Sequence, residues 1–205
     1  QAHLDQVTAD TSDAVRKSAR EKRHAKGFRT ARENLADLVD GDSFVEYGRL
    51  AVAAQRGRRD PESLRIDTAT DGVITGTATI NKDLIATGES DVAVAIYDYS
   101  VLAGTQGFFH HQKLDRIFEV AERERLPFVM YTEGGGGRPG DTDVKVNIAG
   151  LNSTSFSRWA GLTGKVPRVT VNNGYCFAGN AALFGAGDIR IATKSSSIRS
   201  EEHTS

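Results

Sequence analysis

Apolar and polar residues alternate in short segments along the last two thirds of the chain, and the period of this alternation predicts its elements. Within residues 109–125 the apolar positions recur at helical spacing, which predicts an amphipathic helix. Further helices are expected at 153–162 and 178–184. Apolar, β-branched runs bounded by turn residues predict strands. These runs lie at residues 73–80, 92–99, 126–131, 168–172 and 189–192. Strands that alternate with helices in this way predict an α/β fold with crossover connections.

The first forty residues have a different texture. Residues 11–39 are polar and helix-forming, with a thin apolar stripe of Val15, Phe28, Leu35 and Leu38. We expect residues 1–40 to form an amphipathic helical lead-in that packs on the main body and keeps one face in solvent. Residues 40–70 are rich in loop-forming residues, and residues 56–61 are expected to be an exposed connection.

Composition narrows the functional classes. The chain has 205 residues with 26 basic and 27 acidic side chains, so its charge does not favour nucleic acid or another polyanion as a partner. No apolar stretch approaches the roughly 20 residues that a membrane span needs, and no signal-peptide pattern is present. The single cysteine, Cys176, excludes a disulfide within the chain. Together these features predict a cytoplasmic protein.

Both ends of the sequence read as cuts. The chain begins at Gln1, and residues 199–205 abandon the apolar pattern of the segment before them. These last residues resemble the translation of a sequencing-adapter read, which predicts a non-native tail after Ile198. A natural disordered tail would have the same composition. The main domain is expected to cover residues 41–198.

Two turns rich in small residues are the candidate chemistry. One follows the predicted strand at 168–172 and contains Ala178 and Gly179 at the start of a helix. The other, Glu133-Gly-Gly-Gly-Gly-Arg138, contains Gly135 and Gly136. Backbone N–H groups at such turns can stabilise an oxyanion. The glycines lack the spacing and the Lys-Ser/Thr of a phosphate-binding P-loop. An ordinary tight turn would also explain either segment taken alone.

Five segments in order resemble one known family, the carboxyltransferase (beta) subunits of biotin-dependent acyl-CoA carboxylases. Asp98-Tyr-Ser-Val-Leu-Ala-Gly-Thr-Gln-Gly107 resembles the family's D-F-T-V-x-G-G-S-x-G segment. Thr30-Ala-Arg-Glu-Asn-Leu35, followed by Leu38-Val-Asp40 and Ser43-Phe-Val-Glu46, resembles its T-A-R-E-R-I…L-L-D…S-F-x-E segment. Asp71-Gly-Val-Ile-Thr-Gly76 resembles D-G-V-V-T-G, the glycine loop at 133–138 resembles D-S-G-G-A-R, and Gly174-Tyr-Cys-Phe-Ala-Gly179 resembles G-P-C-A-G-G.

The resemblance implies a crotonase-type fold, a superhelix of ββα units, with the family's C-terminal carboxyltransferase domain absent from this chain. It also implies transfer of a carboxyl group from carboxybiotin to the α-carbon of an acyl-CoA through an enolate. Biotin is the implied cofactor, held on a carrier protein, and the CoA thioester is the substrate. The implied partners are biotin carboxyl carrier protein and biotin carboxylase, and the full-length protein is expected to be a homo-oligomer.

The same resemblance assigns roles to single residues. The amides of Ala178 and Gly179 would stabilise the enolate oxygen, assisted by Gly135 and Gly136. The residues expected at CoA are Arg138, Lys113, Gly104 and Gly107. Arg138 would either fix its loop or meet a CoA phosphate, and a solvated surface charge is the alternative for both Arg138 and Lys113. No metal site is expected.

This chain departs from the family pattern at three positions. Glu133 stands where the family has Asp-Ser, and Phe177 and Asn180 replace small residues around the second turn. The acyl chain therefore stays open, and Phe177 is interpreted as a core aromatic.

Two other functions stay open. A crotonase-type hydratase or isomerase would use the same amides but needs an acidic side chain beside the α-carbon, and Glu133 is the candidate. The other is a non-catalytic acyl-CoA-binding fragment, since the 205 residues alone are expected to bind CoA weakly and to catalyse nothing. Cys176 with His110 and His111 is disfavoured as a nucleophile site, because nothing positions a base against the thiol and a small buried cysteine is the commoner case. The adjacent histidines face different sides of a helix, so a metal site is not expected there. Asp141, Asp143 and Asp188 are interpreted as loop and cap residues.

Overall fold

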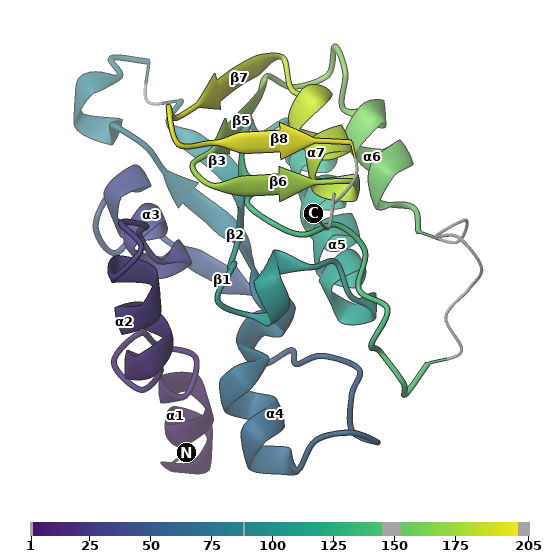
Figure 1. Ribbon diagram of the computed structural model, residues 1–205. Coiled ribbons are helices and arrows are strands. Elements are labelled where there is room, and N and C mark those ends of the chain that lie inside the picture. The colour runs from purple at the N-terminus through teal and green to yellow at the C-terminus, as the bar shows by residue number, and fades with distance from the viewer. Residues whose placement is uncertain (1, 88, 145–152, 201–205) are drawn as a thin grey trace.

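A mixed β-sheet forms the centre of the computed structural model, which describes residues 2–87, 89–144 and 153–200 (Figure 1). The strands are β1 (Val45–Tyr47), β2 (Val73–Thr79), β3 (Asp91–Tyr97), β4 (Phe128–Tyr131), β5 (Arg168–Asn172) and β7 (Ile189–Ala192). They lie in the order β1-β2-β3-β4-β5-β7. The first three pair antiparallel, and β3, β4, β5 and β7 pair parallel. The expected strands and the α/β class are confirmed.

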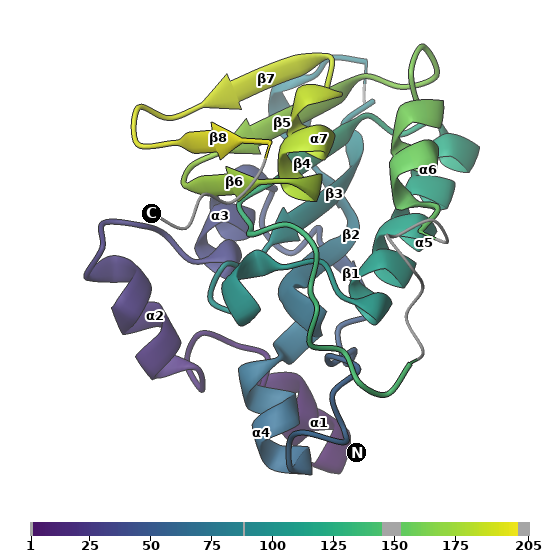
Figure 2. The same cartoon turned by 45° about the vertical axis from the view of Figure 1, so that its right-hand side comes forward.

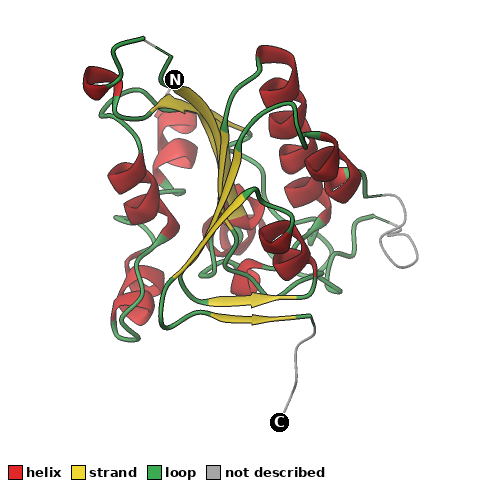
Figure 3. Cartoon of the chain, turned by 90° about the horizontal axis from the view of Figure 1, so that it is seen from above, coloured by secondary structure: helices red, strands yellow, loops and turns green. Residues whose placement is uncertain are grey.

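Helices cover both faces of this sheet (Figure 3). The helices α5 (Phe108–Glu124), α6 (Ser155–Gly161) and α7 (Gly179–Gly185) lie on one face, and α3 (Ala31–Leu38) lies on the other. Side chains of β3 divide between the two layers: Val94 and Ile96 pack with α3, whereas Ala93 and Ala95 pack with α5. This division follows from the two-residue period of a strand, in which successive side chains point to opposite faces.

Helix α5 confirms the predicted amphipathic helix. Its buried positions include Leu114, Ile117 and Phe118, which recur at the spacing of one helical face. The ring of Phe118 packs 5.3 Å from the rings of both Phe128 and Trp159, measured between centroids. This aromatic cluster fills the layer between α5, α6 and the sheet.

The lead-in consists of separate short helices where the sequence suggested a continuous one. Two of them, α1 (Ala2–Ala9) and α2 (Lys17–His24), precede α3. The chain leaves α2 through Gly27, whose φ of 76° favours glycine. Thr30 then begins α3 with a capping box, in which Thr30 and Glu33 each bond the other's backbone N–H. Leu35 is buried as expected, but Val15 is 43% exposed and its place on the apolar stripe was wrong.

Residues 40–70 contain more regular structure than expected. Helix α4 (Pro61–Asp67) begins after Asp60, whose carboxylate accepts hydrogen bonds from the backbone N–H groups of Glu62 and Ser63. Pro61 at the first helical position strengthens this start. The Asp-Pro pair that was interpreted as part of an exposed connection is therefore an N-terminal helix signal.

A second, two-stranded sheet lies beside α7 (Figure 2). Its strands β6 (Tyr175–Phe177) and β8 (Ser197–Arg199) pair parallel and were not predicted. Arg199 thus belongs to a strand, while residues 201–205 lie outside the described residues, so the tail expected after residue 198 stays a prediction. Short 3-10 turns complete the chain: Ala69–Gly72, Lys82–Leu84 and Leu102–Gly104. Within the described ranges, no helix has the length and apolar character that a membrane crossing requires.

Candidate active site

The structure brings the two predicted donor turns together. The glycine loop at 133–138 follows β4, and the turn at 177–179 follows β6. Gly134 joins them: its N–H donates to the carbonyl oxygen of Tyr175 at 2.7 Å, and its own carbonyl accepts from the N–H of Phe177 at 2.9 Å. The two turns therefore form one backbone-bonded unit.

A third segment, residues 103–107, closes the same unit. The N–H of Gly135 donates to the carbonyl of Ala103 at 2.9 Å. The N–H of Gln106 donates to the carbonyl of Gly136 at 2.7 Å, and the N–H of Arg138 donates to the carbonyl of Gln106 at 3.0 Å. The end of the family segment at residues 98–107 thus lies directly against the glycine loop.

The proposed oxyanion donors differ in whether their N–H groups already have a hydrogen-bond acceptor. The N–H of Ala178 donates to the carbonyl of Arg199 at 3.1 Å, and that of Gly136 donates to Oδ1 of Asn180 at 3.0 Å. Gly135 is bonded to Ala103, as above. Neighbouring carbonyl oxygens thus already accept from these three amides, and their assignment to the enolate stays a prediction. The N–H of Gly179 has no acceptor within the part of the chain that the structure describes.

The backbone at Gly179 is closely lined. A Cβ at this position would lie 2.6 Å from Oε1 of Gln106 and 3.0 Å from Cζ of Phe156, so only glycine fits without displacement of these side chains. Gln106 is buried and its Nε2 donates to the hydroxyl of Tyr97 at 3.0 Å. Sequence reasoning named neither Gln106 nor Phe156 as a site residue.

Glu133 is held in a buried ion pair. Its carboxylate accepts hydrogen bonds from Nη1 and Nη2 of Arg23 at 2.9 and 2.6 Å. Burial raises the pKa of Glu133, although the hydrogen bonds and charge of Arg23 oppose this effect. A carboxylate whose two oxygens are occupied by an arginine is poorly placed to take a proton from a substrate, so the hydratase alternative loses its candidate base.

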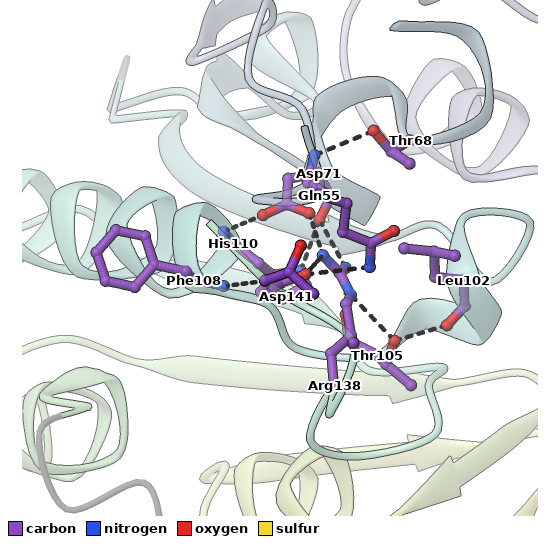
Figure 4. Close-up of polar contacts among 12 residues, drawn as sticks. Gln55, Thr68, Asp71, Leu102, Thr105, Phe108, His110, Arg138 and Asp141 are labelled. Carbon is purple, nitrogen blue, oxygen red and sulfur yellow. Dashed lines mark hydrogen bonds and ion pairs between the residues drawn. The ribbon is translucent and has the colours of Figure 1, made fainter. Parts of the chain in front are cut away.

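Arg138 is an internal residue of the loop (Figure 4). Its side chain is 3% exposed, forms an ion pair with Asp71, and donates from Nη2 to the carbonyl of Thr105 at 2.7 Å. Asp141 lies nearby and accepts from the N–H of Phe108 at 2.8 Å, which caps the start of α5 as the sequence suggested for this aspartate. The surface-charge alternative for Arg138 is wrong, and its geometry is that of a residue that fixes the loop.

Lys113 is also buried. Its Nζ donates to the carbonyl of Thr70 at 2.8 Å and to the carbonyl of Val73, and burial lowers its pKa to about 7. The alternative of a solvated surface charge is therefore wrong for Lys113 as well.

The two remaining glycines assigned to CoA serve close packing. A Cβ at Gly104 would lie 2.5 Å from the carbonyl oxygen of Glu133, and one at Gly107 would lie 2.1 Å from Nη1 of Arg138. Contact of either glycine with CoA stays a prediction.

The cysteine and histidines do not form a nucleophile site. Cys176 is buried, its Sγ lies 3.6 Å from the hydroxyl of Thr132, and burial raises the pKa of its thiol to about 11. The imidazole Nδ1 of His110 lies 3.0 Å from the carbonyl of Asp71, whereas that of His111 lies 3.0 Å from the hydroxyl of Ser155. No group of three or more metal-ligating side chains occurs among the described residues.

Comparison with known proteins identifies the family. Residues 22–199 match the carboxyl transferase domain family. The chain belongs to this family. The carboxyltransferase relatives include the biotin-dependent acetyl-/propionyl-coenzyme A carboxylase beta5 subunit of Mycobacterium leprae, 30% identical over 179 residues, which cover 87% of this chain and 30% of that protein. The chain thus spans about a third of the length of the curated relatives it matches.

Solved structures of carboxyltransferases confirm the fold. A single-chain, multi-domain long-chain acyl-CoA carboxylase is similar with a TM-score of 0.91 and 51% identity, covering 98% of this chain and 20% of that one. The transcarboxylase 12S structure, described as a hexamer assembly, has a TM-score of 0.75 and 28% identity, covering 98% of this chain and 36% of that one. The resemblance to carboxyltransferase subunits and the crotonase-like fold are both confirmed.

Proposed function

We propose that this chain is the acyl-CoA-binding part of a carboxyltransferase that moves a carboxyl group from carboxybiotin to the α-carbon of an acyl-CoA. The observation that carries the proposal is the Gly179 amide, which has no acceptor among the described residues and stands on a family loop bonded to the glycine loop. Because the chain covers about a third of the length of its relatives, the activity, substrate and partners of the whole protein are all parts of this proposal.

The chain's own contribution to the reaction is electrostatic. Negative charge develops on the thioester oxygen when the α-proton leaves, and an N–H donor aimed at that oxygen stabilises the enolate. The Gly179 amide fills this role, and the Gln106 and Phe156 side chains lie beside it. When bound, carboxybiotin supplies both CO2 and the nitrogen that accepts the α-proton.

The side chains around the loops fit a reaction whose base is the cofactor. Glu133 is engaged by Arg23, and burial raises the pKa of Cys176 and lowers that of His110 well below its usual value. Arg23 occupies both oxygens of Glu133, the thiol of Cys176 stays protonated and the imidazole of His110 resists protonation, so these groups are compatible with proton removal by biotin.

A long-chain acyl-CoA is the first substrate to test. The structure that is 51% identical to this chain is that of a long-chain acyl-CoA carboxylase. Phe156 is partly exposed beside Gly179 and offers an apolar surface next to the proposed enolate donor. A biotin carboxyl carrier and a biotin carboxylase complete the proposal as partners, together with assembly into a homo-oligomer and a cytoplasmic location.

Carboxyl transfer by the full-length protein tests the proposal. We would offer carboxybiotin on its carrier and a panel of saturated acyl-CoAs of increasing chain length, and measure labelled carboxyl in the product. Enoyl-CoA hydration, assayed in parallel, tests the alternative. Carboxylated product without hydration supports the proposal, and hydration or isomerisation without carboxylation contradicts it.

A further inference from the structure

An ion pair joins the lead-in to the glycine loop. Arg23 belongs to α2, and Glu133 begins the loop that follows β4. Both side chains are almost fully buried, at 8% and 4% exposure, and the guanidinium bonds both carboxylate oxygens. Such a two-point contact fixes direction as well as distance between the groups.

Every side of the guanidinium is occupied. Its Nε and Nη2 also donate to the carbonyl of Arg29 at 3.2 and 3.1 Å. The rings of Phe28 and Tyr99 lie 4.9 and 5.4 Å from its central carbon, within cation–π range. Arg23 is therefore held in one place by neighbours that do not belong to either donor loop.

Glu133, which Arg23 holds in place, contacts the segments on both sides of the junction between the loops. Its carboxylate packs so closely against the connection between β5 and β6 that a Cβ at Gly174 would lie 2.1 Å from Oε1. The next residue, Gly134, carries the two backbone hydrogen bonds that join the loops. A shift of Glu133 would thus move both loops relative to each other.

We propose that Arg23 is a positioning residue of the candidate active site: through Glu133 it sets the relative placement of the glycine loop and of the turn that carries Gly179. This inference rests on the proposed function. It deepens that function by making α2 of the lead-in a part of the catalytic apparatus. A displacement of about 1 Å at a site can cost on the order of a hundredfold in rate, so turnover depends on Arg23 more than affinity does.

The chain offers a matched control. Arg32 of α3 forms a similar two-point pair with Glu46 of β1, at 2.7 and 2.9 Å, and likewise ties the lead-in to the sheet. Among the described residues, neither Arg32 nor Glu46 forms a hydrogen bond or ion pair with a side chain of either donor loop. Arg32→Met therefore removes an ion pair of the same kind without acting on Glu133.

The test uses the full-length protein with Arg23→Lys, Arg23→Met and Arg32→Met. We expect Arg23→Met to lower kcat for acyl-CoA carboxylation on the order of a hundredfold, with KM within about threefold. Arg23→Lys keeps the charge but loses the fork, and should fall between wild type and Arg23→Met. Arg32→Met should leave kcat within about threefold of wild type. Equal kcat losses in the Arg23→Met and Arg32→Met variants would overturn the inference.

Hydrogen exchange separates this inference from the proposed function. Amides of residues 134–138 should exchange faster in Arg23→Met than in Arg32→Met, whether or not the protein carboxylates an acyl-CoA. If Arg23→Met does not fold, the double variant Arg23→Met/Glu133→Gln removes the unpaired buried charge and takes its place in both assays. Unchanged exchange at the loop contradicts the positioning role. A wild-type protein that carboxylates no acyl-CoA contradicts only the proposed function.

Discussion

The backbone N–H of Ala178 donates to the carbonyl oxygen of Arg199 across 3.1 Å, so strand β8 closes one of the two amides that the family resemblance assigns to the enolate. Ala178 itself has a φ of 47° and a ψ of −118°, which turns the chain sharply into α7. The adjacent N–H, that of Gly179, has no acceptor among the described residues and is the proposed donor. Substitutions at Gly179 therefore give the most direct test of the site.

Gly179→Pro removes the proposed donor, and Gly179→Ala keeps it. Proline is tolerated at the first position of a helix, where its missing N–H breaks no helical hydrogen bond. Both substitutions add a Cβ that meets Gln106 and Phe156. The two variants share the added Cβ and differ in the N–H, so the ratio of their rates reports the effect of losing the amide donor.

We expect kcat for carboxyl transfer to be about a hundred- to a thousandfold lower for Gly179→Pro than for Gly179→Ala, as for other lost oxyanion donors. Steady-state assays of the full-length variants, with circular dichroism to check folding, measure this. Equal rates in two folded variants would assign the enolate to another donor.

The buried Lys113 should make the free energy of unfolding depend on pH. Its pKa is lowered by burial from 10.5 to about 7, so between these values the folded chain binds fewer protons than the unfolded chain. Stability therefore rises with pH across this window, by at most about 1.4 kcal/mol per pH unit for one proton. Below about pH 7 both states are protonated at Lys113, and this dependence ends.

Lys113→Met should remove that dependence. Urea unfolding of the chain and of the variant at pH 7, 8 and 9 measures the free energy of unfolding. The difference between wild type and variant should shift in favour of wild type as the pH rises. A constant difference across the three pH values would show that Lys113 titrates outside the window.

Gly174→Ala should disturb the junction between the two donor loops. The new Cβ would lie 2.1 Å from Oε1 of Glu133, whose carboxylate cannot retreat without straining its bonds to Arg23. We expect the variant to lose about 1–3 kcal/mol of unfolding free energy, the usual cost of overpacking.

Gly137→Ala is the matched control, because a Cβ there has nothing within 4 Å. Its unfolding free energy should stay within about 0.5 kcal/mol of wild type. Shortening the acid in Gly174→Ala/Glu133→Asp should recover part of the loss. If Gly174→Ala is as stable as Gly137→Ala, the carboxylate is not wedged between the loops.

Local patterns predicted the sheet and α5, because burial of one face imposes a period on the sequence around it. They did not predict the Arg23–Glu133 pair, whose members lie 110 residues apart. Arginine is seldom buried, and only a partner from a distant segment makes its burial favourable. For the same reason Arg138 and Lys113 were interpreted as possible surface charges, although the structure buries both. The bond that occupies the Ala178 amide depended on β8, a strand of three residues, which is too short to produce a pattern.

Removal of the Arg138 side chain should cause a large loss of stability. Its guanidinium is 3% exposed and neutralises Asp71, whose side chain is fully buried. Arg138→Met leaves that carboxylate without its charge partner, which typically costs about 3–5 kcal/mol. The exposed pair of Arg116 and Glu119, at 55% and 51% exposure, supplies the control. Arg116→Met should change the unfolding free energy by less than about 1 kcal/mol, because exposed pairs contribute little.

A truncated substrate distinguishes the loop-fixing role of Arg138 from contact with a CoA phosphate. Arg138→Lys keeps a positive charge but not the planar fork that meets both Asp71 and the carbonyl of Thr105. If Arg138 fixes the loop, carboxylation by the full-length variant should fall by the same factor with acyl-CoA and with an acyl-pantetheine that lacks the nucleotide phosphates. A phosphate contact would instead weaken the reaction of acyl-CoA alone. Since the side chain is already enclosed by Asp71, Thr105 and Asp141, we expect equal factors.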